Sequence, residues 1–163
     1  MSKAGAAAPA VSMQGISKRF GAVQANREVT LNVAAAVATG RRIFGQVNTA
    51  GPRHVLYVDY EMTTADIQDR LSDMGYGPEV DLSHLHYALL PSIDPLDTKA
   101  GAERVCDLAT QVNAELVVID TMARAVEGDE NDADTVRNFY RHTGMKLKQA
   151  GRTYSRMDHA GKD

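Results

Sequence analysis

Apolar and polar positions follow two different periods from residue 54 to the end of the chain. Short apolar runs rich in β-forming residues predict strands at residues 54–59, 85–90, 116–119 and 153–157. Between these runs, apolar residues recur three and four positions apart, which predicts helices that end at Gly75, near Val112 and at Gly151. Strands that alternate with helices are typical of an α/β fold, in which crossover helices connect a mostly parallel sheet.

The part of the chain before residue 54 has a weaker pattern. Residues 13–33 contain two short, partly alternating apolar stretches around the turn-prone pair Phe20-Gly21, which predicts an N-terminal β-hairpin. Residues 34–39 are rich in alanine, and Gly40 with the two arginines that follow is typical of a helix end. We therefore expect a flexible tail over residues 1–12, then the hairpin, then the last part of a helix.

Composition limits the number of domains and the classes of partner. A chain of 163 residues, 44% of them hydrophobic, suits one packed domain, which we place at residues 13–163. The net charge of -3 gives no general reason to bind nucleic acid tightly, although one basic helix leaves a local contact open; its charged residues are Arg137, Arg141, Lys146 and Lys148. No apolar run approaches the ~20 residues of a membrane span, so we expect no membrane partner. A single cysteine without metal-ligand spacing favours a reducing, cytoplasmic location.

Polar groups suited to phosphate chemistry follow three of the predicted strands. They are the pairs Asp59 with Glu61, Asp120 with Thr121, and Asp158 with His159. In open α/β sheets, ligands bind beyond the carboxyl ends of the strands. An aspartate there can hold the water shell of Mg²⁺, the role we predict for Asp120, and Glu61 can orient or deprotonate an attacking water. Each signal alone also fits a turn or a helix cap, but together they favour function.

Four motifs in a fixed order carry a family resemblance. They are VLYVDYEM at 55–62, LVVIDTMAR at 116–124, GDEN at 128–131 and MDHAGKD at 157–163. With these motifs, the stretch from about residue 34 to residue 163 resembles the RecA-like ATPases of the RepA replicative-helicase type, which are AAA-family proteins. The combination of motifs is far more specific than any one of them.

The resemblance implies cofactors, partners and residue roles. Its cofactors would be ATP and Mg²⁺, and its partners would be further copies of the chain in a ring. Glu61 would be the catalytic glutamate, Asp120 the Walker B aspartate and His159 the phosphate-sensing histidine. Thr121 and Arg124 would lie beside the nucleotide.

The phosphate-binding loop of that family is absent from the sequence. A Walker A motif, GxxxxGK[ST], should precede the helix that ends at Thr39, because its backbone N–H groups and its lysine hold the phosphates, yet no such motif occurs. Instead, residues 15–33 resemble the opening hairpin of ABC-transporter ATPase subunits, where an aromatic residue at the position of Phe20 stacks on adenine. The sequence therefore predicts an incomplete RecA-like P-loop NTPase core with a junction near Val33.

The leading functional hypothesis is an ATPase-family protein, related to proteins of DNA replication, whose catalysis is impaired. Asp120 and Glu61 should not suffice without the phosphate cradle. Two alternatives stay open: a non-catalytic module that docks on intact ATPase subunits, and a truncated or recombinant remnant without an evolved function. His84 and His86 share one strand face as metal ligands could, but a surface or packing role is favoured because no acidic or thiol partner has suitable spacing.

Overall fold

One parallel sheet organises the chain. The computed structural model describes residues 25–46 and 50–158. Its four strands lie in the order β2-β1-β3-β4, and every neighbouring pair is parallel. The strands are β1 (Val55–Asp59), β2 (Leu85–Leu89), β3 (Leu116–Asp120) and β4 (Thr153–Arg156). The α/β class with a parallel sheet, as predicted for an incomplete RecA-like core, is confirmed.

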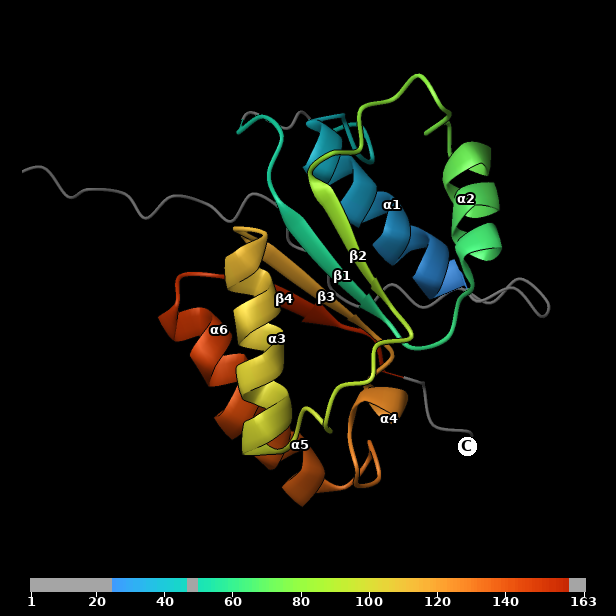
Figure 1. Cartoon of the computed structure of the whole chain (residues 1–163). Helices are drawn as coiled ribbons and strands as arrows, with labels where there is room; N and C mark the ends of the chain where they lie inside the picture. The colour runs from blue at the N-terminus through green and yellow to red at the C-terminus, as the bar shows by residue number, and fades with distance from the viewer. Residues whose placement is uncertain (1–24, 47–49, 159–163) are drawn as a thin grey trace, which may run out of the picture.

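Helices cover both faces of this sheet (Figure 1). One face carries α1 (Ala25–Thr39) and α2 (Thr64–Asp73). The other carries α3 (Lys99–Gln111), α5 (Ala133–Phe139) and α6 (Met145–Gln149), with the π-helical turn η1 (Tyr140–Gly144) between the last two. A short helix, α4 (Met122–Ala125), follows β3 directly. Because each strand leads into a helix that returns to the start of the next strand, the connections are crossovers.

The two faces of the sheet form two apolar cores. Alternate residues of β1 point to opposite faces, so Val55 and Tyr57 pack with α1, whereas Leu56 and Val58 pack with α3. All five residues of β1 are buried. A strand buried on both faces reads as a continuous apolar run, which explains why β1 and β3 were predictable from sequence. The edge strand β4 is only half-buried.

Local signals set the ends of the helices. Thr63 caps α2 in a capping box: its hydroxyl accepts a hydrogen bond from the Asp66 N–H, and the Asp66 carboxylate accepts one from the Thr63 N–H. Gly40 follows α1 with φ of 71°, the left-handed conformation that commonly ends a helix. The end of α1 at Gly40 agrees with the prediction made for this residue.

The predicted hairpin over residues 13–33 is wrong where the structure describes it. Residues 25–33 belong to α1, which runs without interruption through Val33. Four buried side chains of α1 recur at helical spacing and pack against the sheet; they are Leu31, Ala34, Ala35 and Ala38. This packing outweighs the short alternating pattern that predicted a strand. Residues 1–24, including the first half of that hairpin and Phe20, lie outside the described residues.

Candidate functional site

Two aspartates lie side by side where β1 and β3 end. Asp59 and Asp120 are register partners on these neighbouring strands, and both are fully buried. Residues in register on parallel strands point to the same face of the sheet. Tyr57, two residues before Asp59, shares this face and donates a hydrogen bond from its hydroxyl to Asp120 Oδ2 at 2.7 Å. The face is the one that α1 covers, since Tyr57 packs in the α1 core.

The Asp59 carboxylate fixes the turn after β1. Its Oδ1 accepts hydrogen bonds from the backbone N–H groups of Glu61, at 2.8 Å, and Met62, at 3.0 Å. Its Oδ2 is buried and has no hydrogen-bond partner among the described residues. The backbone of the same turn is tied to β3, because the Tyr60 N–H donates to the Asp120 carbonyl at 2.8 Å. The position of Glu61 therefore depends directly on Asp59 and on β3.

Glu61 reaches across to the segment that follows β3. Its Oε1 accepts hydrogen bonds from the Thr121 hydroxyl and from Arg124 Nε, each at 3.2 Å. The Glu61 side chain is 17% exposed and that of Arg124 is 65% exposed, so this ion pair opens to solvent on its arginine side. The peptide bond between Asp120 and Thr121 is cis. The edge thus combines two buried carboxylates, a third carboxylate, a hydroxyl and a guanidinium.

Burial keeps the hydroxyl of Tyr57 protonated. Burial, and after it the nearby negative charge of Asp120, raises the pKa of Tyr57 far above its usual range. Burial likewise raises the pKa of the neighbouring Tyr60 to about 12. Tyr57 therefore remains a donor to Asp120 across the physiological range of pH.

The dipole of α1 has its positive end toward this edge. In Figure 1, α1 runs opposite to the strands, and its N-terminal end lies toward the carboxyl ends of β1 and β3. The N-terminus of a helix carries unpaired N–H groups and a partial positive charge, which favours anions.

Four of the predicted site residues meet at this edge. The structure brings together Glu61, Asp120, Thr121 and Arg124, which the sequence placed at the ends of two strands. His159, like Phe20, lies outside the described residues. Sequence reasoning assigned no role to Tyr57, or to Asp59 beyond its place at a strand end. The period of two along β1, which puts both on one face, was the signal that would have found them.

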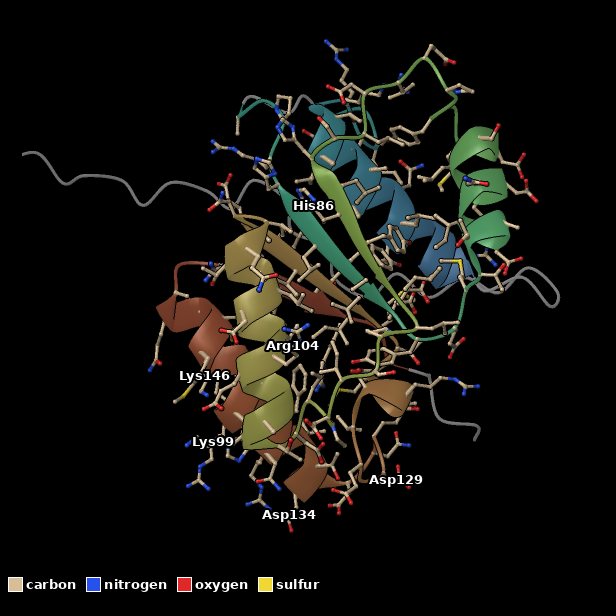
Figure 2. All side chains as sticks on the ribbon, in the orientation of Figure 1. His86, Lys99, Arg104, Asp129, Asp134 and Lys146 are labelled. Atoms are coloured by element: carbon tan, nitrogen blue, oxygen red, sulfur yellow. The ribbon has the colours of Figure 1, made fainter. Side chains whose placement is uncertain are left out.

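A second polar cluster lies at the other end of the strands, at the amino ends of β1 and β2. His54 Nδ1 and His86 Nε2 are 3.0 Å apart, and the His54 and His84 rings meet edge to face with centroids 4.3 Å apart. Figure 2 shows His86 toward the end of β2 that is remote from α4. Within the described part of the chain, no group of three or more His, Cys, Asp and Glu side chains is arranged to hold a metal ion.

This histidine cluster is expected to weaken the fold in mild acid. Burial, followed by the charges of His54 and His84, lowers the pKa of His86 below the usual 6.5. The unfolded chain then binds a proton more readily than the folded one, so stability is full above about pH 6.5 and falls as the pH drops through the lower native pKa. Urea unfolding at roughly pH 7.5 and 5.5 checks this. The variant His86→Gln should lose less stability between the two pH values than the wild type, and an equal loss would contradict the assignment.

Three of the four basic residues on the α5–α6 side are engaged in local contacts. Arg137 pairs with Asp134, and Lys146 lies 3.6 Å from Glu103 of α3. The Lys148 ammonium stands over the Tyr140 ring at 5.3 Å. These contacts fit a solvated helix face, and a nucleic-acid contact there stays an untested prediction.

Fold and site together define a class of protein. A parallel sheet with crossover helices and with acidic groups at the carboxyl ends of its inner strands fits an incomplete RecA-like core. A family model described as an AAA domain matches residues 28–163. The chain therefore belongs to the AAA-domain family. A comparison with curated proteins finds no match. No helix in the described part of the chain has the length and apolar character needed to span a bilayer.

Proposed function

We propose that this chain binds a nucleoside triphosphate, with ATP as the first candidate, together with Mg²⁺ at the carboxyl edge of β1 and β3. The observation that carries this proposal is the pair of fully buried, register-matched aspartates. Burying a carboxylate costs several kcal/mol unless a cation or hydrogen-bond donors compensate it. Hydrogen bonds compensate part of this cost, and a cation that arrives with a ligand would compensate more of it.

The residues at this site fit the Mg²⁺ ion that would accompany the nucleotide. Mg²⁺ is usually held by one or two carboxylates, waters and phosphate oxygens. Asp120 suits the metal's water shell, and Glu61 suits the orientation of an attacking water, a step that Mg²⁺ assists by withdrawing charge from the phosphates. The exposed guanidinium of Arg124 can move from Glu61 to phosphate oxygens, and Thr121 can donate a hydroxyl hydrogen bond.

The residues that would hold the phosphates form a less complete set, so we propose that the chain hydrolyses ATP slowly or not at all. The sequence has no GxxxxGK[ST] motif, and with it lacks the lysine that normally neutralises the β- and γ-phosphates. The N-terminal end of α1 offers a partial substitute. The same proposal includes kinship with the RepA-type helicase ATPases, ring formation and a cytoplasmic location. It also includes a phosphate-sensing role of His159 and an adenine-stacking role of Phe20.

Equilibrium binding of MgATP, measured by calorimetry, tests the proposal. We expect saturable binding to the wild type, and binding weakened about tenfold or more in Arg124→Ala and Asp120→Ala. The matched control is Asp69→Ala, which removes an exposed carboxylate from α2 and should bind as the wild type does. Arg124→Ala changes a largely exposed side chain, so it serves even if Asp120→Ala fails to fold. No binding at millimolar ATP would exclude the proposed function.

A docking module remains the second candidate function. It is favoured by the outer edge of β4, which pairs with no further strand among the described residues and leaves Thr153 and Ser155 exposed. Sedimentation of the chain with an intact AAA-domain ATPase, with and without ATP, separates the candidates. Association that needs no nucleotide, together with absent ATP binding, would support the docking module.

A further inference from the structure

One buried oxygen at the acidic edge is not explained by the fold. Asp59 is fully buried, and its Oδ1 alone accepts both N–H groups of the turn that carries Glu61. Its Oδ2 has no hydrogen-bond partner among the described residues. A buried polar atom without a partner costs about 1–3 kcal/mol, and more when it is charged.

The turn by itself does not require a carboxylate at this position. An asparagine would present the same Oδ1 to the N–H groups of Glu61 and Met62 and would carry no charge. A carboxylate here is also unfavourable, because its register partner is the carboxylate of Asp120. Two like charges in a medium that excludes water repel each other strongly. Because the Arg124 guanidinium at this edge pairs with Glu61, a second buried negative charge is useful only when a further positive charge arrives.

We propose that Asp59 has two roles: its Oδ1 positions Glu61, and its Oδ2 acts as a second carboxylate toward the divalent cation that accompanies the nucleotide, through the cation's water shell. This inference rests on the proposed function. It assigns the cation to two neighbouring strand ends, with Asp120 on β3 and Asp59 on β1. Waters bound to Mg²⁺ are strong hydrogen-bond donors, and a buried carboxylate oxygen is a suitable acceptor for them.

The variant Asp59→Asn separates the two roles. Asparagine keeps the acceptor for the backbone of Glu61 and Met62 and removes only the charge. Without ligand, we expect the variant to be as stable as the wild type or more stable, because a buried charge has been removed. Toward metal-free ATP, in EDTA, its affinity should hold or rise, since repulsion between Asp59 and the triphosphate is gone.

The decisive readout is the gain in ATP affinity that Mg²⁺ provides, measured by calorimetry with Mg²⁺ and again with EDTA. We expect this gain to be about 10- to 100-fold smaller in Asp59→Asn than in the wild type. The control Asp73→Asn, which changes an exposed carboxylate at the end of α2, should leave the gain unchanged. Asp59→Ser, which keeps a short side-chain acceptor, repeats the test if Asp59→Asn does not fold.

The outcomes distinguish this inference from the proposed function. In one outcome, ATP binding to the wild type depends on Mg²⁺ and on Asp120, and Mg²⁺ raises the ATP affinity equally in the wild type and in Asp59→Asn. This outcome would overturn the role of Asp59 and leave the nucleotide site standing. That result would mean that Asp59 serves only the turn. Absence of nucleotide binding to the wild type would overturn both. A loss of affinity that is equal with Mg²⁺ and with EDTA would show that Asp59 acts on the turn and not on the cation.

Discussion

The variant Phe139→Ala is expected to lower the free energy of unfolding by about 3–5 kcal/mol. Phe139 ends α5, is 1% exposed and belongs to the core beneath β3. Its ring meets that of Tyr154 on β4 at a centroid distance of 6.0 Å, and the Arg156 guanidinium stands 5.6 Å from the ring centre. Removal of the ring would leave a cavity between the α5–α6 segment and the edge strand.

The next residue provides the control for this prediction. Tyr140 has a similar size but is 44% exposed at the start of η1, so Tyr140→Ala should cost about 1 kcal/mol or less. Urea unfolding of both variants, followed by far-UV circular dichroism, measures the difference. Equal losses in the two variants would contradict the packing of Phe139 under the sheet.

Most of the strands and helices from residue 54 onward were predictable because local and tertiary preferences agree there. The run Leu116–Asp120 is apolar and β-branched, and it becomes a central strand buried on both faces. Around residues 25–33 the two preferences differ. The short alternation of apolar and polar residues predicted a strand. The alanines that continue the segment allow a helix to pack closely on β1 and β3, and this burial decides the structure.

The order of strands along the chain was enough to predict which residues gather at the candidate site. Residues directly after parallel strands must gather at one edge, which is why Glu61 and Asp120 could be named together. The partner of each side chain depends on the register between strands, which sequence pattern alone does not give. The pairing of Asp59 with Asp120, and the hydrogen bond from Tyr57 to Asp120, follow from that register. His54, directly before β1, joins His86 on the neighbouring strand β2 for the same reason.

The variant Gly101→Ala is expected to destabilise the chain by about 3 kcal/mol, near the upper limit for overpacking a core. An alanine inside a helix usually gains up to about 1 kcal/mol over glycine, so the sign is opposite to what helix propensity predicts. The reason is a close approach of backbone: a Cβ at Gly101 would overlap the carbonyl oxygens of Asp94 and Pro95. These atoms belong to the segment that leads into the cap of α3, where Thr98 Oγ1 donates to the Pro95 carbonyl and accepts from the Gly101 N–H.

Gly144→Ala is the matched control, because it places a methyl group in a buried helical glycine of η1. There the nearest atom is the Tyr154 hydroxyl oxygen, 2.7 Å from the added carbon, at the end of a side chain that can move. Its cost should therefore be clearly smaller than that of Gly101→Ala when both are measured by urea unfolding. If Gly101→Ala stabilises the chain, the first turn of α3 does not press on the Asp94–Pro95 backbone. The gain would then come from the lower conformational entropy of the unfolded chain.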